Sequence, residues 1–273
     1  MSPYKEQSDL SRINQQAFSS PVKTTPEIYR IIKTSLQYSE MTEGAFDITF
    51  SSVGYLYDYR EHKRPDKTAI AANLSGINFR HLMLNDQEHS VGFQSKGMRI
   101  DLGGIAKGYA VDNAIKILKT AGVINAYVSA GGDSFALGDR KGRPWFIAIK
   151  HPRNANQVLL SIPLENLAVS TSGDYERYFD EDGVRYHHII NPKTGDSARE
   201  SQSVTILAND SITADALSTS VFILGPQKGL KLINSLSGIS AVIADKDGKV
   251  HYSDDLVNPN HWFRSPTCLR HHG

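Results

Sequence analysis

The chain has 273 residues with an ordinary globular composition, 40% hydrophobic and 22% charged, and a formal net charge of +1. This length suits one large domain or two small ones with a sizeable core. The balanced charge and the lack of Lys/Arg runs argue against a nucleic-acid-binding face, and the single cysteine, Cys268, excludes an internal disulfide and a cysteine-based metal cage. No apolar run is long enough to span a bilayer, and the N-terminus is too polar for a signal peptide, so we expect a soluble chain.

The first 45 residues predict two helices. Residues 1–14 are polar, with Leu10 and Ile13 at helical spacing, which favours a frayed start with one short helix. Thr25 precedes a proline and an acid, the pattern of a helix N-terminus, and the following helix should run to about Met41.

The next segment, Gly44-Ala45-Phe46-Asp47, allows two interpretations. It could cradle a flat ligand, or it could be a glycine-ended helix followed by a buried phenylalanine, and its sequence alone favours the second. Residues 55–73 are charged and show little periodicity, so we expect a surface excursion there. Residues 79–84 and 90–93 look like short antiparallel strands.

The stretch from Asp101 to Asp112 is the most informative part of the chain. Residues 98–102 alternate as a strand does, Gly103-Gly104 interrupts the pattern, and an apolar helical pattern begins at Ile105. Glycines allow a ligand to approach the backbone, and a helix N-terminus followed by Lys107 suits a phosphate. The alternative is an ordinary strand–helix turn with a solvated lysine.

The second half of the chain alternates strands with polar turns. His187 and His188 stand at a strand end before an Asn-Pro turn, and such a pair is either catalytic, metal-binding or neither. Gly131-Gly132-Asp133 similarly ends a strand with glycines and an acid. The expected strands cover residues 126–130, 145–150, 158–162, 167–170, 204–207 and 240–244.

A helix capped by Ser211 or Thr213 should end at Gly225, and a second should cover residues 228–236. Asp215 and Thr219 are four residues apart and therefore share one helix face. A hard cation, which prefers oxygen ligands, would offset the cost of burying them, whereas the alternative is a local Asp–Thr hydrogen bond.

Seven short motifs occur in an order that resembles the ApbE family, the bacterial FAD:protein FMN transferases. The resemblance extends from Tyr4 to about Leu256. It implies an α+β, T-fold-like architecture with mixed or antiparallel sheets, and magnesium-dependent transfer of FMN from FAD to a Thr or Ser hydroxyl of a target protein, with release of AMP. The motifs are Ser8–Asn14, Gly44–Asp47, Asp101–Gly108, Gly131–Asp133, Ser172–Asp174, His188–Gly195 and Ala214–Thr219.

The same resemblance assigns roles to individual residues. His188 matches a histidine implicated in the chemistry, and it is a candidate base for the acceptor hydroxyl. Asp215 and Thr219 match side-chain ligands of Mg²⁺, and Gly104 matches a backbone-carbonyl ligand. The residues that match FAD contacts are Tyr4, Ala45, Phe46, Asp47, Asp101, Lys107 and Ile189. The implied partners are FAD and acceptor proteins such as subunits of membrane redox complexes.

This chain departs from the family pattern at both ends. Family members usually begin with an export signal, often a lipoprotein one, followed by a strand with a Met-Gly-Thr-like segment, and this chain starts downstream of both. We therefore expect a single flavin transferase domain over residues 1–273, lacking that strand, with a tail of unclear role at 257–273. The family is usually periplasmic and membrane-anchored, so this chain would be cytoplasmic or a truncated mature form. Two alternatives to transfer are an FAD pyrophosphatase that yields FMN and AMP, and a non-catalytic FAD-binding protein.

Overall fold

A six-stranded antiparallel sheet forms the centre of the computed structural model, which describes residues 5–257 apart from the side chain of Ala155. Tyr4 and the predicted tail beyond residue 257 lie outside the described residues. The strand order is β13-β12-β11-β8-β5-β4, so neighbours in the sheet are often distant in sequence. The strands are β4 (Ala126–Ala130), β5 (Asp133–Leu137), β8 (Leu167–Gly173), β11 (Ser201–Ala208), β12 (Ser240–Asp245) and β13 (Val250–Tyr252).

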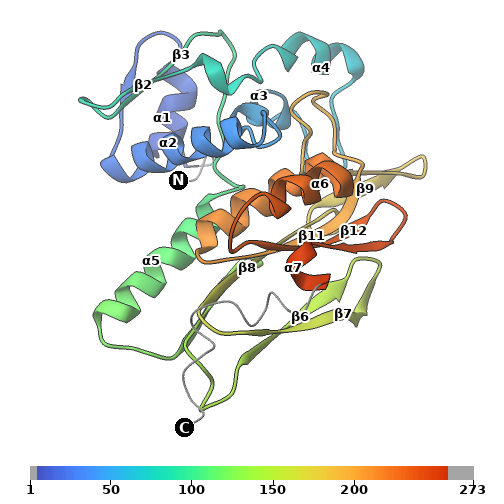
Figure 1. The fold of residues 1–273 in the computed structure, drawn as a ribbon. Coiled ribbons are helices and arrows are strands. Elements are labelled where there is room, and N and C mark those ends of the chain that lie inside the picture. The colour runs from blue at the N-terminus through green and yellow to red at the C-terminus, as the bar shows by residue number, and fades with distance from the viewer. Residues whose placement is uncertain (1–4, 258–273) are drawn as a thin grey trace.

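Both faces of this sheet are covered, as Figure 1 shows. The helices α5 (Ala106–Thr120) and α6 (Ser211–Asn234) pack on one face, and the hairpin of β6 (Trp145–His151) and β7 (Asn154–Leu164) lies on the other. All eight residues of β11 are buried as a result. Burial on both faces explains why β11 lacks the strict alternation of apolar and polar residues that a half-buried strand shows.

Two close contacts join α5 to α6. A Cβ atom at Gly108 would lie 2.2 Å from the Ser211 carbonyl oxygen, so only glycine permits this approach. Asp112 accepts hydrogen bonds from the first backbone N–H groups of α6, Ser211 at 2.8 Å and Ile212 at 2.9 Å. The N-cap is Asp210, which accepts from Thr213 N at 2.8 Å, so the predicted caps Ser211 and Thr213 are wrong.

The predicted break at Gly225 is confirmed, because φ is +73° there and Pro226 follows. Helical hydrogen bonding resumes beyond the kink, so the two predicted helices are the two arms of α6. A left-handed φ favours glycine, and proline has no N–H with which to continue the first arm. The kink is therefore determined by the two residues that the sequence places there.

The predicted strand at 98–102 is wrong. These residues are not in a strand, because polar groups from other parts of the chain take the hydrogen bonds that a neighbouring strand would make. Asn14 bonds to both the N–H and the C=O of Ile100, at 2.8 and 2.9 Å. Ser52 Oγ accepts from Arg99 N at 3.0 Å, and Ile48 O accepts from Asp101 N at 2.9 Å. The helix start predicted at this turn is confirmed by α5, which begins at Ala106.

A smaller layer is built from the first hundred residues. The predicted short helix is α1 (Asp9–Gln16), in which Leu10 and Ile13 are fully buried and which Ser8 caps. The long helix α2 begins at Pro26 with Thr25 as N-cap and ends at Met41, as predicted. The other elements are β1 (Val22–Lys23), η1 (Ile48–Phe50), α3 (Ser51–Gly54), α4 (Lys67–Leu74), η2 (Phe79–His81), β2 (Leu82–Asn85) and β3 (Ser90–Phe93).

Several elements were not predicted. The surface excursion at 55–73 contains α4, which begins after the N-cap Asp66 but buries no residue and therefore leaves no apolar periodicity. The hairpin of β9 (Tyr178–Glu181) and β10 (Val184–His187) is rich in charged residues, and β13 is short. The α+β class with antiparallel sheets is confirmed. A short terminal helix, α7 (Asp254–Val257), ends the described chain.

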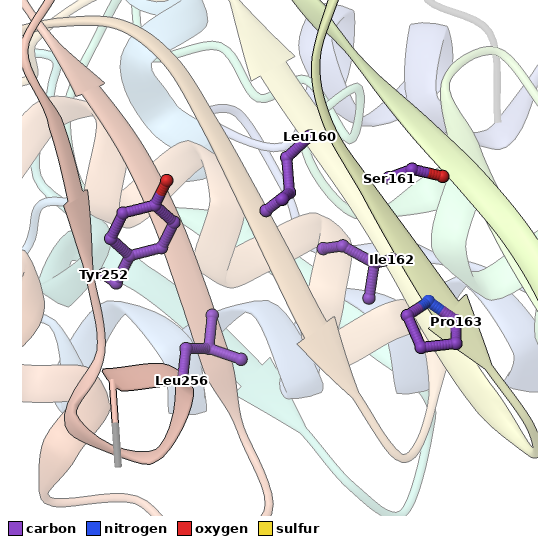
Figure 2. A pocket seen from close by; sticks show the side chains of 6 residues that line it. All are labelled: Leu160, Ser161, Ile162, Pro163, Tyr252 and Leu256. Carbon is purple, nitrogen blue, oxygen red and sulfur yellow. The ribbon is translucent and has the colours of Figure 1, made fainter. Parts of the chain in front are cut away.

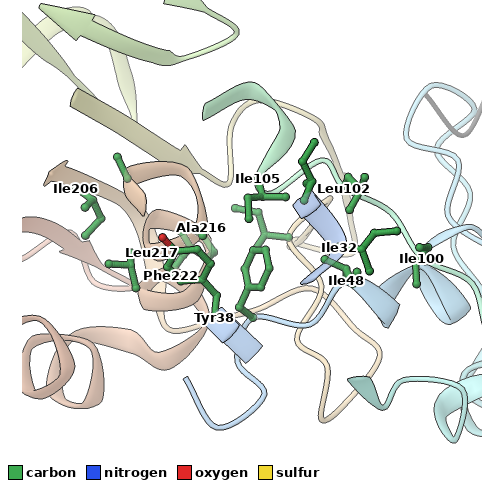
Figure 3. Close-up of a cluster of buried hydrophobic side chains, with 14 of the residues drawn as sticks. Ile32, Tyr38, Ile48, Ile100, Leu102, Ile105, Ile206, Ala216, Leu217 and Phe222 are labelled. Carbon is green, nitrogen blue, oxygen red and sulfur yellow. The ribbon is translucent and has the colours of Figure 1, made fainter. Parts of the chain in front are cut away.

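Two apolar clusters hold these layers together. The larger one joins α1, α2, α5 and α6 to one face of the sheet, and Figure 3 shows Tyr38, Ile105 and Phe222 within it. The smaller one lies between the other face and β6–β7. A cavity of about 330 Å³ opens beside it, where Leu160 and Ile162 face Tyr252 and Leu256 (Figure 2). None of the predicted site residues lines this cavity.

Candidate functional site

Three charged side chains from three elements meet at the start of α5, and we call them the lysine cluster: Lys107, Asp133 and Asp215. Lys107 Nζ lies 2.7 Å from Asp133 Oδ2 and 2.6 Å from Asp215 Oδ1. The N–H of Gly108 donates to Asp215 Oδ2 at 3.0 Å. The two carboxylates are 1% and 2% exposed, whereas the lysine side chain is 40% exposed. The lysine thus reaches from the surface to two buried acids.

The lysine cluster has more negative than positive charge. With both acids ionised, two carboxylates face one ammonium, which leaves a net charge of −1 in a buried place. Burial raises the pKa of Asp133, as does the charge of Asp215, while Lys107 opposes the shift. Burial works against the charged form of Lys107, but Asp215 and Asp133 outweigh it and raise the pKa of the lysine. The cluster can therefore be balanced by one more cation or by a proton on Asp133.

Residues from three of the family motifs lie together next to this cluster. A Cβ atom at Gly104 would be 3.2 Å from Phe46 Cε2 and 3.4 Å from Thr219 Oγ1, so these three residues are neighbours. Thr219 Oγ1 also lies 3.4 Å from Ser172 Oγ. Both oxygens of Asp215 accept from Lys107 and Gly108 rather than from Thr219, so the alternative of a local Asp–Thr hydrogen bond is not what the structure has.

The two adjacent histidines have different environments. His187 is 2% exposed, its Nε2 bonds to Ala198 O at 2.8 Å, and its Nδ1 accepts from Ile189 N at 3.3 Å. Both ring nitrogens of His187 are therefore engaged in hydrogen bonds with the backbone. His188 has a buried Nδ1 with no hydrogen-bond partner among the described residues. Burial, followed by the charges of His187 and Arg177, lowers the pKa of His188 to about 4, so its imidazole is neutral at pH 7.

Two predicted FAD-binding carboxylates hold the local backbone. Asp47 Oδ1 accepts from Thr49 N and Oγ1 at 2.8 and 2.6 Å, and its Oδ2 accepts from Phe79 N at 3.0 Å. Asp101 Oδ1 accepts from Gly103 N at 2.6 Å, which fixes the double-glycine turn. Burial raises the pKa of both acids. Their side chains organise the two loops that flank Gly104.

The remaining predicted FAD contacts are either buried and apolar or outside the described residues. Ala45 and Ile189 are both buried, at 5% exposure, and Ile189 belongs to the larger apolar cluster, so their contacts with FAD stay predictions. Tyr4 lies outside the described residues.

Two residues of the site had no predicted role. Arg177 carries a charge that acts on both Asp101 and His188. Asp133 stands in a motif that was recognised, but its pairing with a lysine 26 residues away is not visible in the sequence. Only the motif itself could have marked Asp133 as a candidate.

The donors around the lysine cluster fit Mg²⁺. Within residues 5–257 no three His, Cys, Asp or Glu side chains are grouped to hold a metal ion. Mg²⁺ does not need such a group, since it commonly takes one or two carboxylates together with water and substrate phosphates. Asp215 and Thr219 offer oxygen atoms, and the buried Asp133 Oδ1 has no hydrogen-bond partner among the described residues. This chemistry and the net negative charge suit a hard cation.

Comparisons with known proteins identify the family. The sequence profile described as the ApbE family matches residues 1–243. The chain belongs to the ApbE family. It is 33% identical to the FAD:protein FMN transferase of Treponema pallidum, covering 94% of this chain and 76% of that protein, and 35% identical to the one of Haemophilus influenzae, covering 85% and 70%.

Solved ApbE structures share the fold. The ApbE protein of Thermotoga maritima superposes with a TM-score of 0.87 at 37% identity, covering 94% of this chain and 84% of that one. The flavin transferase ApbE of Vibrio cholerae gives a TM-score of 0.84 at 30% identity with the same coverage. The prediction that this ApbE chain is an enzyme is confirmed by these relatives. No helix within residues 5–257 combines the length and the apolar character needed to cross a membrane.

Proposed function

We propose that this ApbE chain transfers FMN from FAD to a threonine or serine hydroxyl of an acceptor protein, with release of AMP. The observation that supports this most is the lysine cluster together with His188, which is near enough to be affected by the charge of Lys107 and whose Nδ1 has no hydrogen-bond partner among the described residues. The cluster has an ammonium at the N-terminus of α5, and its excess of negative charge suits a cation that would bind the diphosphate together with the helix N-terminus. The relatives' shared name, FAD:protein FMN transferase, supports the choice of substrate.

The reaction needs one bond formed and one broken. The acceptor oxygen forms a bond with the FMN phosphorus, the bond from that phosphorus to the bridging oxygen breaks, and AMP leaves with that oxygen. His188, neutral at pH 7 because burial lowers its pKa to about 4, takes the proton of the hydroxyl. Such a low pKa means that the proton is held only briefly and is passed on to the leaving phosphate or to water.

The other residues bind and orient FAD. Lys107 supplies positive charge to the diphosphate, and the resemblance assigns flavin contacts to Ala45, Phe46 and Ile189, which are apolar. Mg²⁺, held by Asp215, Thr219 and the Gly104 carbonyl, would supply further positive charge to the phosphates. Asp47 and Asp101 act through the backbone, because their oxygens hold the loops that carry Phe46 and Gly104. The acceptors that we expect are subunits of membrane redox complexes.

One assay tests this function. The chain is incubated with FAD, Mg²⁺ and a candidate acceptor, and the acceptor is then examined for covalent flavin by fluorescence on a denaturing gel and by mass. We expect a flavinylated acceptor and one equivalent of AMP, and no label on a matched acceptor whose target Thr is replaced by Val. FMN and AMP without labelled acceptor would instead indicate a pyrophosphatase, and no product at all would indicate an FAD-binding protein.

A further inference from the structure

A second cavity, of about 100 Å³, lies beyond His187, and we call it the arginine cavity. Its charged lining consists of Arg153, Arg185, Arg199 and Lys246 with one acid, Asp174. No residue of the lysine cluster lines it. The arginine cavity therefore has an excess of positive charge, whereas the lysine cluster has an excess of negative charge. The proposed transfer reaction does not use this cavity.

Two of these cations are occupied by strong ion pairs. Arg153 binds Asp174 with both ends of its guanidinium group, Nη1 to Oδ1 and Nη2 to Oδ2, each at 2.7 Å. Arg185 lies 3.7 Å from Asp174 and donates to Asp180 at 3.0 Å. The single acid of the cavity is therefore already shared by Arg153 and Arg185.

The other two cations have only weak acidic partners. Arg199 Nη1 donates to the carbonyl of Arg185, while its Nη2 lies 3.7 Å from Asp196, and Lys246 lies 3.3 Å from Asp247, the residue next to it. The side chains of both ion pairs are exposed, at 40% and 39% for the first and 60% and 73% for the second. Exposed pairs of this kind are worth little. Breaking these two ion pairs would therefore cost little free energy, so Arg199 Nη2 and the Lys246 ammonium can bind a ligand instead.

Two buried polar groups in the cavity wall have no partner. Ser201 is 3% exposed and Gln202 8% exposed, and neither Ser201 Oγ nor Gln202 Oε1 makes a hydrogen bond within the described residues. Gln202 Nε2 donates to Lys246 O at 3.0 Å, which fixes the amide and leaves its oxygen free. Buried polar atoms without a partner are rare and costly, so they call for a ligand or ordered water.

We propose that the arginine cavity binds a small oxyanion, the carboxylate or phosphate group of a ligand, through Arg199, Lys246 and the Ser201 hydroxyl. The volume of about 100 Å³ is sufficient for one such group. Gln202 Oε1 accepts a hydrogen bond from an N–H or O–H group beside the anion. The anion is either free in solution or the acidic side chain of a bound protein, and both present the same chemistry.

Titration calorimetry at pH 7 and constant ionic strength tests the proposal. The probes are inorganic phosphate and N-acetyl-aspartate amide, which carries a carboxylate with neighbouring N–H groups. We expect Lys246→Gln and Ser201→Ala each to weaken binding of the preferred probe by about tenfold, as for loss of one charge-assisted or buried hydrogen bond. Lys249→Gln is the matched control, because Lys249 is exposed on the same turn and does not line the cavity.

The two probes distinguish the sources of the anion. Tighter binding of phosphate points to a free anion, and tighter binding of the aspartate amide points to a protein side chain. The proposal is overturned if neither probe binds, or if Lys246→Gln and Ser201→Ala bind as the Lys249→Gln control does. If Ser201→Ala fails to fold, the comparison of Lys246→Gln with the control decides the test. The Lys246 side chain is 60% exposed, so its replacement should leave the fold intact. The test involves no flavin transfer, so its result is independent of the proposed function.

Discussion

The lysine cluster and the arginine cavity are built from the same kinds of group in opposite proportions. In the first, two carboxylates that are 1% and 2% exposed face one lysine. In the second, four cations surround one acid that is 8% exposed. A charge removed from water must be balanced locally, so an excess of buried acid attracts a cation and an excess of base attracts an anion. The two places therefore have opposite charge balances, and this is why we expect a cation at the lysine cluster and propose an anion at the arginine cavity.

The adjacent residues His187 and His188 belong to different regions. His187 lines the arginine cavity with both ring nitrogens engaged, while His188 is close enough to Lys107 for the lysine charge to lower its pKa. His187 is the last residue of β10, and His188 follows it in a bend outside the strand. His187 therefore holds the fold, and we propose that His188 takes part in the chemistry.

The largest expected effect is that of Asp215→Asn, which removes the charge imbalance of the lysine cluster. We expect kcat/KM for flavin transfer to fall by at least about 100-fold, beyond what is usual for groups that only support a metal ligand. Mg²⁺ should raise the Tm of the wild type and not that of the variant, since only a protein that binds the ion is stabilised by it. Equal Mg²⁺ responses of the two proteins would contradict a cation site at Asp215.

His188→Asn should come next, with a loss of transfer rate of about 10²–10⁴-fold, the usual range for a general base. Its FAD affinity and Tm should stay close to those of the wild type, because Nδ1 has no hydrogen-bond partner to lose among the described residues. The neighbouring variant His187→Asn is the control, and it should instead lose about 1–3 kcal/mol of stability through its broken bond to Ala198. A His188→Asn protein that transfers flavin at the wild-type rate would exclude the proposed base.

The effect of Asp133→Asn on the free energy of unfolding should depend on pH. The folded pKa of Asp133 is raised above its ordinary 3.8, so the folded protein holds the proton more tightly than the unfolded chain does. Its contribution to stability is then complete below pH 3.8 and is lost as the pH rises towards neutrality. Relative to the wild type, Asp133→Asn should gain about 1–3 kcal/mol between pH 4 and pH 7, measured by urea unfolding. A constant difference across this range would show that Asp133 is not protonated in the fold.

The smallest effect is expected from Arg153→Met in the arginine cavity. Asp174 would lose its two 2.7 Å contacts but keep Arg185 nearby, so stability should fall by about 1–2 kcal/mol, which lowers Tm by roughly 2–8 °C. Arg60→Met, an exposed arginine elsewhere, should leave Tm unchanged. Similar Tm values for the two variants would mean that Arg185 alone neutralises Asp174.

Features that depend on neighbouring residues could be predicted from the sequence. The cap and proline at Thr25-Pro26, the helix start after Gly103-Gly104 and the interruption at Gly225, predicted as a helix end and found as a kink, all follow from local backbone preference. The order of the motifs also identified the family. The candidate site residues were taken from that resemblance, and their roles stay predictions. Residues 98–102 mark the limit, since their alternation predicted a strand and Asn14 took its hydrogen bonds instead.

Which charges meet could be known only from the packing of the elements. Lys107 and Asp215 are separated by 108 residues, and Asp133 joins them because β5 begins beside the first turn of α5. The arginine cavity likewise collects Arg153, Arg199 and Lys246 from separate parts of the chain. Residue patterns report on contacts within one helix or strand, whereas the balance of buried charge depends on how elements distant in sequence pack together. Lys107 and Asp215 could therefore be named from the sequence, whereas the basic residues of the arginine cavity could not, and the packing set the charge balance of both places.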